Sequence, residues 1–255
     1  MKSGPLTRYH KILSVVAAAP GGLAVSELMK KAELPKSSAH RMAATLCEAG
    51  YLTHSDSGNY TLGPALDDII RSRISASYKG KAFTKALREL ENRFEETAFC
   101  ARLSNGVVEI FDVVTPRSGE RSYVYPGLGS RPLDKCSSSR IILAFRDKKE
   151  IESWLEQECQ QSNLSASEIE AAHEAIEVAR RDGYAVCDGE IDEGVCSVAC
   201  PVFLEPFGVL YSIGITGPAA RIKEVSIDKI VKELRIVAEN TAVNLSAEYL
   251  AERSL

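Results

Sequence analysis

The first 62 residues contain three short amphipathic helical patterns followed by two strand-like segments, and this order restricts the possible folds most strongly. Apolar residues recur at i, i+3, i+4 and i+7, the spacing that places them on one face of a helix. The apolar positions of the first two helices are Tyr9, Ile12, Leu13 and Val16, followed by Val25, Leu28, Met29 and Ala32. The tripeptide Pro20-Gly21-Gly22 ends the first helix, and a short break at Glu33-Leu34 ends the second.

Pro35 is placed to open a third helix and Gly50 to close it, because proline fits a first helical turn and glycine a helix end. The apolar positions of this helix are Ala39, Met42, Ala43 and Leu46. Strand-like segments at 51–53 and 60–62 then flank a turn-rich stretch at 55–59. Three helices followed by a two-stranded hairpin predict a winged helix-turn-helix, whose recognition helix enters the major groove of DNA.

The outer face of the third helix follows from its inner face, since each residue turns the helix by about 100°. Ser37, Arg41, Ala44 and Glu48 are expected to point outward. Hydroxyl groups can approach phosphates and long cations can reach base edges, and the polar hairpin tip can lie near a backbone or a minor groove. The candidate DNA-binding residues are Lys36, Ser37, Ser38, His40, Arg41, Thr45, Ser57 and Tyr60. The alternative is a small solvated helical domain with ordinary surface charge.

The charge is distributed unevenly along the chain. The whole sequence has a formal net charge of −4, which alone argues against binding to nucleic acid. Residues 1–62 contain 7 Lys and Arg against 4 Asp and Glu, a balance of +3, so the rest of the chain carries −7. A basic first part and an acidic second part suggest two separate tasks.

Several classes of protein are excluded. No run of about 18 apolar residues is present, so a membrane-spanning helix is not expected. The segment after Met1 is interrupted by charged residues and does not resemble a signal peptide, which favours a cytoplasmic protein whose seven cysteines are reduced. Cys196 and Cys200 on one strand would stand about 13 Å apart, too far to share a metal ion. We therefore expect no metal site and no cofactor.

The remainder of the chain alternates between helical and strand patterns. A helix from Pro64, with Leu66, Ile69, Ile70 and Ile74 on one face, is expected to link two domains. Further helices are predicted at 83–94, 137–145, 149–157, 165–181 and 225–249, and strands at 97–103, 107–114, 123–125, 184–187, 194–203 and 207–216. This pattern predicts an α+β domain with an antiparallel sheet and flanking helices. The expected division is 1–63, a linker helix at 64–79, and 80–255.

Small and polar residues interrupt the apolar strands of the second domain. Gly214 and Thr216 alternate along one strand and so share a face, and Ser197 interrupts another strand. A buried hydroxyl needs a hydrogen-bonding partner. From these residues alone, the partner can be either the backbone or a ligand.

Several motifs, in the same order along almost the whole chain, resemble the IclR (isocitrate lyase regulator) family of bacterial transcription factors. The motifs of the first domain are Leu34-Pro35-Lys36-Ser37-Ser38-Ala39-His40-Arg41-Met42, Gly50-Tyr51-Leu52 and Tyr60-Thr61-Leu62-Gly63. Those of the second are Gly129-Ser130-Arg131-Pro132-Leu133, Asp182-Gly183-Tyr184-Ala185, the run from Glu193 to Val202 and the run from Ser212 to Pro218.

The resemblance implies a winged helix-turn-helix, a linker helix and a GAF-like effector-binding domain with an antiparallel sheet. It implies a ligand-responsive transcriptional regulator, a repressor of a catabolic operon, which binds double-stranded operator DNA as a homodimer or homotetramer. The effector would be a small organic acid or a semialdehyde-type metabolite. The residues implied to bind it are Ser137, Ser138, Cys187, Asp188, Val195, Ser197, Gly214 and Thr216.

The sequence departs from the family in the segment 134–140. Arg140 stands where members commonly have lysine, and Gly214 stands where some members have a hydroxyl side chain. These differences leave the identity of the effector open, although the additional hydroxyl groups suggest an oxygenated or aldehyde-bearing ligand.

Two other function classes compete with regulation. One is an enzyme that acts on a small acid, and the other is an interaction module that binds no small molecule or binds one without catalysis. The sequence contains no Gly-x-Ser-x-Gly, His-Glu-x-x-His or phosphate-loop motif, and His173 is the only histidine beyond residue 54. A non-enzymatic function is therefore expected.

Overall fold

The computed structural model describes residues 4–55, 58–66, 69–70, 81–104, 106–117, 122–162, 164–205 and 207–252. The chain forms two compact units, Met1–Arg73 and Ile74–Leu255, here called the head and the body. No helix among the described residues is both long enough and apolar enough to span a membrane.

The head contains the three predicted helices and the predicted hairpin, with one additional strand. Its elements are α1 (Pro5–Ala17), β1 (Leu23–Ala24), α2 (Val25–Ala32), α3 (Lys36–Glu48), β2 (Leu52–His54) and β3 (Asn59–Leu62). The strands pair antiparallel in the order β1-β3-β2. The two-residue strand β1 was not predicted, because two residues are too few to show a period.

The core of the head follows the helical patterns of the sequence. The four apolar positions predicted to point inward from α3 are all buried, and the four predicted to point outward are all exposed. Helix α2 ends at Glu33, whose φ of 54° is in the left-handed region that lets a chain leave a helix abruptly. The short turn from Glu33 to Pro35 then directs the chain into α3. The predicted faces of α3 are thus confirmed.

The predicted linker helix falls only partly within the described residues. Residues 64–66 and 69–70 are helical, and Ile69 and Ile70 are exposed. The rest of the segment 64–79, including Ile74, lies outside the described residues.

The body is built on a six-stranded antiparallel sheet with the strand order β6-β5-β4-β9-β8-β7. Its strands are β4 (Thr97–Ser104), β5 (Val107–Val114), β6 (Gly129–Ser130), β7 (Ala185–Asp188), β8 (Val195–Leu204) and β9 (Gly208–Pro218). Its helices are α5 (Lys81–Phe94), α6 (Ser137–Leu143), α7 (Lys148–Ser162), α8 (Ala166–Asp182), α9 (Ala219–Val225) and α10 (Ile227–Glu252). The α+β class and the antiparallel sheet are confirmed.

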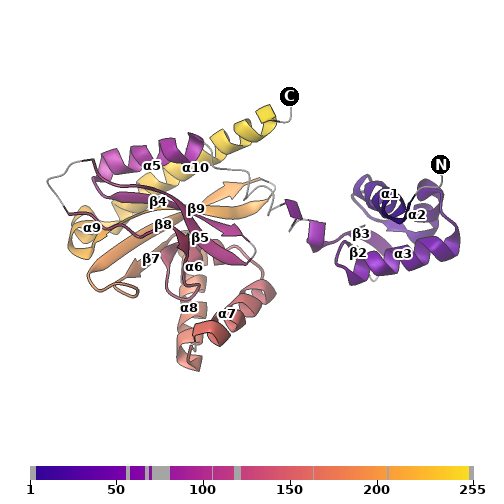
Figure 1. The fold of residues 1–255 in the computed structure, drawn as a ribbon, viewed down its shortest axis with the longest axis horizontal. Coiled ribbons are helices and arrows are strands. Elements are labelled where there is room, and N and C mark those ends of the chain that lie inside the picture. The colour runs from indigo at the N-terminus through magenta and orange to yellow at the C-terminus, as the bar shows by residue number, and fades with distance from the viewer. Residues whose placement is uncertain are drawn as a thin grey trace. The chain divides into compact units, whose positions relative to one another are not determined.

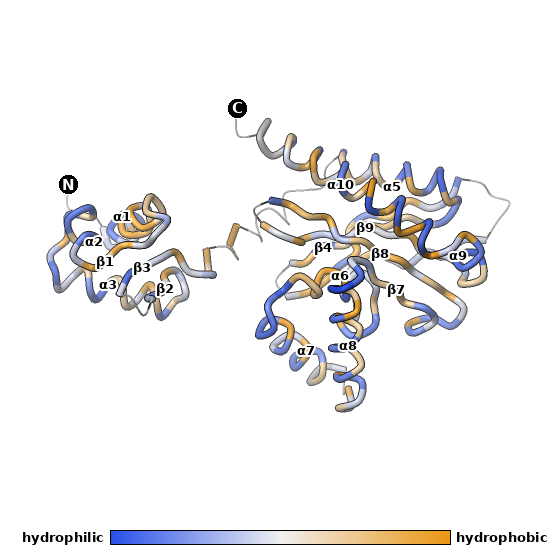
Figure 2. Tube along the Cα trace, turned by 180° about the vertical axis from the view of Figure 1, so that it is seen from behind, coloured by the Kyte–Doolittle hydropathy of each residue, from blue (hydrophilic) through white to orange (hydrophobic). Residues whose placement is uncertain are grey.

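Helices cover both faces of the sheet (Figure 1). Helices α5 and α10 pack on one face over a core that includes Val198 and Ile213. Helices α6 and α8 pack on the other face over a second core that includes Phe99 and Ala199. Figure 2 shows hydrophilic and hydrophobic residues alternating along α5, as expected for a helix with one face on a sheet.

One prediction for the body was wrong. Residues 123–125 form no strand, and Tyr123 and Tyr125 are exposed, so their aromatic alternation does not reflect a sheet position. The last predicted helix, 225–249, corresponds to α10, whereas the short helix α9 before it was not predicted; Ser226, with a φ of 76°, separates the two. By contrast, the predicted capping box of α8 is present, with Ser165 Oγ accepting a hydrogen bond from the Glu168 backbone N–H.

The close approach of Gly50 and Gly63 gives a test of the head. A Cβ atom at Gly63 would lie 2.3 Å from the Gly50 carbonyl oxygen, whereas one at Gly21 would meet no atom within 4 Å. Because the obstacle is backbone, we expect Gly63→Ala to destabilise the head by about 1–3 kcal/mol. Urea unfolding with hydrogen exchange of head amides measures this effect, with Gly21→Ala as the control. Equal stability of the two variants would contradict the prediction.

Candidate functional site

Helix α3 presents an exposed polar face that begins at its first turn. Lys36, Ser37, His40, Arg41 and Thr45 are exposed, and Ser38 is half-buried. The first turn contains no acidic residue, and no side chain caps the helix start at Pro35. The first N–H groups of a helix have no partner within it and favour anions. This face therefore combines free backbone donors, hydroxyl groups and cations.

The hairpin contributes fewer residues to the candidate DNA-binding surface than the sequence predicted. The base of its turn is held by Ser55, whose N–H donates to the Asn59 carbonyl oxygen at 2.9 Å. Tyr60 is only 9% exposed and packs in the head core, with its ring centroid 4.6 Å from that of His54. The structure thus does not bring Tyr60 to the surface formed by α3. Ser57 lies outside the described residues.

In the body, the strand register aligns polar residues of four adjacent strands in one row. Cys187 pairs with Ser197, Ser197 pairs with Thr216, and Thr216 pairs with Thr97. Alternate residues such as Cys196 and Ile215 belong to the core beneath α5 and α10, so this row faces α6. We call Cys187, Ser197, Thr216 and Thr97 the polar row.

The start of α6 meets this row. Ser137 and Ser197 share a hydrogen bond between their Oγ atoms at 2.8 Å. Ser137 and Ser138 are fully buried, and Ser138 Oγ has no hydrogen-bonding partner among the described residues. Thr216 Oγ1 donates to the Cys196 carbonyl oxygen at 3.3 Å, which leaves its lone pairs available. Four of the predicted effector residues are therefore brought together: Ser137, Ser197, Thr216 and Cys187.

A row of small residues lies beside the polar row. Ala185, Ala199 and Gly214 align across β7, β8 and β9, and Gly214 pairs with Phe99 on β4. A Cβ atom at Gly214 would lie 2.4 Å from the Val198 carbonyl oxygen and 2.5 Å from Cζ of Phe99. The Phe99 ring and the Val198 carbonyl oxygen thus fill the space that a side chain at position 214 would need. This explains why glycine stands at position 214.

Asp188 and Val195 lie at the edge of this arrangement. Asp188 pairs with Cys196, so it belongs to the opposite set of alternating residues, and its Oδ2 forms an ion pair with Lys223 Nζ at 2.6 Å. The structure therefore does not bring Asp188 together with the polar row. Val195 alternates with Ser197 on the same face and is half-buried.

The Cys187 thiol is 6% exposed. Burial raises the pKa of this thiol to about 11, with a further contribution from the charge of Glu190. The thiol therefore remains protonated near neutral pH and presents a weak S–H donor rather than an anion.

Arg140 lies one turn beyond the start of α6 and is fully engaged. Its guanidinium donates to Glu190 Oε1 at 2.7 Å and Oε2 at 2.5 Å, to the Val186 carbonyl oxygen, and twice to the Asp134 carbonyl oxygen. Burial lowers the pKa of Arg140, but the hydrogen bond and charge of Glu190 outweigh burial and raise it. All five N–H donors are thus used within the protein.

Sequence reasoning missed Thr97 and Phe99. Thr97 is fully buried, and its hydroxyl donates to the Val124 carbonyl oxygen at 2.6 Å. Neither residue belongs to a motif, and their position opposite β9 depends on which strands pair. The sequence indicated only that Thr97 and Phe99, as alternate residues of one strand, share a face.

The arrangement has the chemistry of a binding site for a small oxygenated molecule. Hydroxyl groups and the start of α6 can donate hydrogen bonds to carboxylate, carbonyl or hydroxyl oxygens. No acid–base pair or activated nucleophile is formed by the four members of the polar row.

The comparisons with known proteins agree over both units. The family described as "IclR helix-turn-helix domain" matches residues 5–56, and the family described as "Bacterial transcriptional regulator IclR C-terminal" matches residues 80–243. The chain is 25% identical over 224 residues to the transcriptional regulator KipR of Bacillus subtilis, covering 85% of this chain and 87% of that one. It is also 25% identical to the transcriptional repressor IclR of Escherichia coli, covering 86% and 81% of the two chains.

A solved structure shows the same fold. The IclR homolog of Microbacterium hydrocarbonoxydans in complex with 4-hydroxybenzoate is 20% identical, with a TM-score of 0.55, covering 95% of this chain and 99% of that one. These relatives are regulators rather than enzymes, which excludes the enzyme alternative. Because the family match spans the helix-turn-helix and most of the body, the chain belongs to the IclR family of bacterial transcriptional regulators.

Proposed function

We propose that the protein is an effector-responsive repressor of a catabolic operon, acting in the cytoplasm. In this proposal, a winged helix-turn-helix at 1–63 reads the operator, a helix at 64–79 links the domains, and residues 80–255 bind the effector and assemble the oligomer. The observation that carries the proposal is the buried hydroxyl cluster between α6 and the polar row. A buried hydroxyl without a partner, such as Ser138 Oγ, costs free energy unless a ligand or water satisfies it.

The exposed face of α3 supports operator binding. Arg41 and His40 extend from the same helix whose first turn offers unpaired N–H groups to a phosphate. Phosphate contacts would position the helix, and the long side chain of Arg41 would read a base edge. A balance of only +3 in the head makes a single copy a weak binder, so a homodimer or homotetramer is needed for affinity.

The effector class follows from the donors of the site. Arg140 has no N–H left for a ligand, so an acidic group would be held by hydroxyls and by the start of α6. Phe99 limits the space over Gly214, which favours a small molecule. The Microbacterium relative binds 4-hydroxybenzoate, a small hydroxylated acid of the same general chemistry. We therefore propose a small organic acid or a semialdehyde.

Regulation then requires a difference in effector affinity between two states of the protein. An effector that binds more tightly to the state with low operator affinity shifts the population toward that state and releases DNA. The name of the Escherichia coli relative, a transcriptional repressor, favours repression over activation. An interaction module without a ligand would show no such shift.

Replacement of Arg41 tests the DNA-reading face. We expect Arg41→Ala to weaken binding to DNA from the protein's own promoter region by about 1–3 kcal/mol, because a base-edge contact is lost. Fluorescence anisotropy on this duplex and on a scrambled duplex of equal length measures the effect. Arg8→Ala, an exposed charge removal on α1, is the matched control and should affect both duplexes equally. Unchanged affinity would remove Arg41 from the reading residues.

Replacement of Ser138 tests the effector site. We expect Ser138→Leu to abolish the effector response and to leave operator binding intact, since leucine removes the unpartnered hydroxyl and adds bulk at a fully buried position. The probe is any acid or semialdehyde that raises the melting temperature of the wild type in a thermal-shift screen that includes 4-hydroxybenzoate. Ser138→Ala retains the fold if leucine disrupts it, and Ser167→Leu on the exposed start of α8 is the control. A retained response in both Ser138 variants would place the effector elsewhere.

A further inference from the structure

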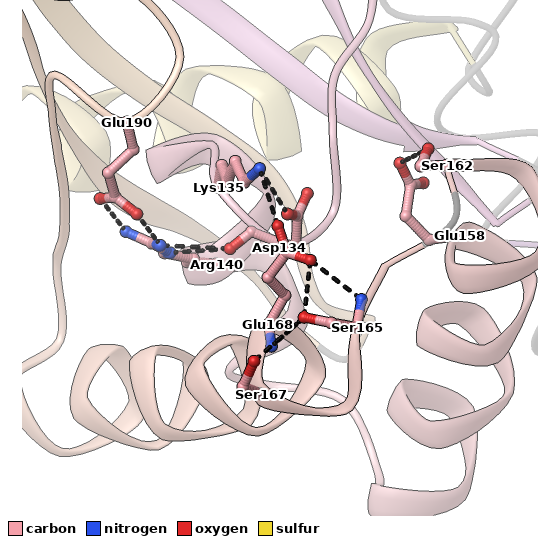
Figure 3. Close-up of polar contacts among 9 residues, drawn as sticks. All are labelled: Asp134, Lys135, Arg140, Glu158, Ser162, Ser165, Ser167, Glu168 and Glu190. Atoms are coloured by element: carbon pink, nitrogen blue, oxygen red, sulfur yellow. Dashed lines mark hydrogen bonds and ion pairs between the residues drawn. The ribbon is translucent and has the colours of Figure 1, made fainter.

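We propose that Arg140 and Glu190 form a latch that fastens the β7–β8 loop to α6 and thereby positions the start of α6 over the polar row. The inference rests on the proposed effector site and adds to it a positioning pair that contacts no ligand. Figure 3 shows Glu190 facing the guanidinium of Arg140, with Asp134 and Lys135 on the other side.

The first observation is the geometry of the pair. Both carboxylate oxygens of Glu190 accept from the two terminal nitrogens of Arg140, an arrangement that fixes orientation as well as distance. The remaining donors hold the Val186 carbonyl oxygen on the edge strand β7 and the Asp134 carbonyl oxygen before α6. A single side chain thus connects the loop, the sheet edge and the approach to α6.

The second observation is the construction of the loop between β7 and β8. Gly189 and Gly194 both have a φ of 77°, a conformation that favours glycine, and they stand at its two ends. Between them, Ile191, Asp192 and Glu193 are exposed, and within the described residues their side chains make no hydrogen bond or ion pair to another element. Glu190 is therefore the side chain that ties this loop to α6, while at the far end of the loop the Gly194 carbonyl oxygen accepts a hydrogen bond from the Ala219 N–H at 2.7 Å.

The third observation is that the approach to α6 is also held from its other side. Lys135 Nζ lies 3.6 Å from Asp134 Oδ2 and 3.7 Å from Glu168 Oε1, the carboxylate that caps α8. The segment 134–140 is therefore suspended between α8 and the β7–β8 loop (Figure 3). Loss of either the Lys135–Glu168 or the Arg140–Glu190 ion pair would therefore leave the start of α6 held from one side only.

The partial exposure of the Arg140–Glu190 ion pair is consistent with a contact that can break and re-form. The Arg140 side chain is 11% exposed and the Glu190 side chain is 38% exposed. A fully buried pair resists separation, and a fully exposed pair restrains little, so this pair lies between the two limits. The loop connects β7, which carries Cys187, to β8, which carries Ser197. Its release would therefore loosen both members of the polar row and the hydrogen bond between Ser137 and Ser197.

The latch is tested first without any ligand, in the full-length protein. Hydrogen exchange of amides 189–194 and 137–140 is compared among the wild type, Glu190→Gln and Glu190→Asp. Glu190→Gln removes the charge at almost constant size and should accelerate exchange about tenfold, whereas Glu190→Asp should recover part of the protection. Glu193→Gln makes the same charge change in the same loop and should leave exchange unaltered.

The second arm measures coupling to the effector site. The probes are pyruvate, succinate semialdehyde and 4-hydroxybenzoate, each titrated by calorimetry. For a probe that binds the wild type, Glu190→Gln should raise Kd about five- to tenfold with faster dissociation, and Arg140→Lys, which cannot form the fork, should act in the same direction. Operator affinity without a probe should not change.

The outcomes separate the two claims. Wild-type exchange rates in Glu190→Gln would overturn the latch, whatever the probes do. Accelerated exchange with unchanged probe affinity would overturn its positioning role. If no probe in a full panel of acids and semialdehydes binds the wild type, the proposed effector function fails, and the exchange rates alone decide whether the latch exists.

Discussion

The antiparallel pairing of β8 with β9 is the constraint on which the body depends. These two long strands are neighbours in the sheet, with the edge strand β7 beside β8 and with β4 beside β9. Their register places Ser197 opposite Thr216, and the flanking pairs add Cys187 and Thr97 to the same row. A shift of β8 by one residue against β9 would turn Ser197 to the opposite face, toward α5 and α10, and would break its alignment with Thr216. The polar row therefore exists because the apolar residues of these strands fix the register.

The same register explains why a polar site can exist inside an apolar domain. The hydroxyl groups collect at one end of the α6 face, where Ser137 meets Ser197, and they border the core beneath α6 and α8, to which Phe99 and Ala199 belong. Arg140, a cation within α6, is paired with Glu190. Its guanidinium therefore adds no unpaired charge to the start of α6. The net charge is −7 beyond residue 62 and +3 in residues 1–62, because the acidic residues lie mostly in the body.

Much of this architecture was predictable from the sequence, and the failures have physical causes. Periodicity identified the faces of α3 because the spacing of apolar residues over a few helical turns is enough to show which face is buried. It missed β1, which has only two residues, and it misread Tyr123–Tyr125, where aromatic side chains alternate without a sheet partner. Thr97, Phe99 and Glu190 could not be assigned to the site, because their roles depend on strand order and on a loop that reaches across to α6. Arg140 was visible as a departure from the family pattern, but its partner was not.

The measurement that tests the account most directly is a map of effector-induced protection. Hydrogen exchange of the full-length protein is recorded with and without the compound that most raises its melting temperature. We expect protection to concentrate at 137–140, 195–198 and 214–216, with smaller changes in the head. Protection centred on the outer faces of α5 and α10, or on the head alone, would contradict the assignment of the polar row as the effector site.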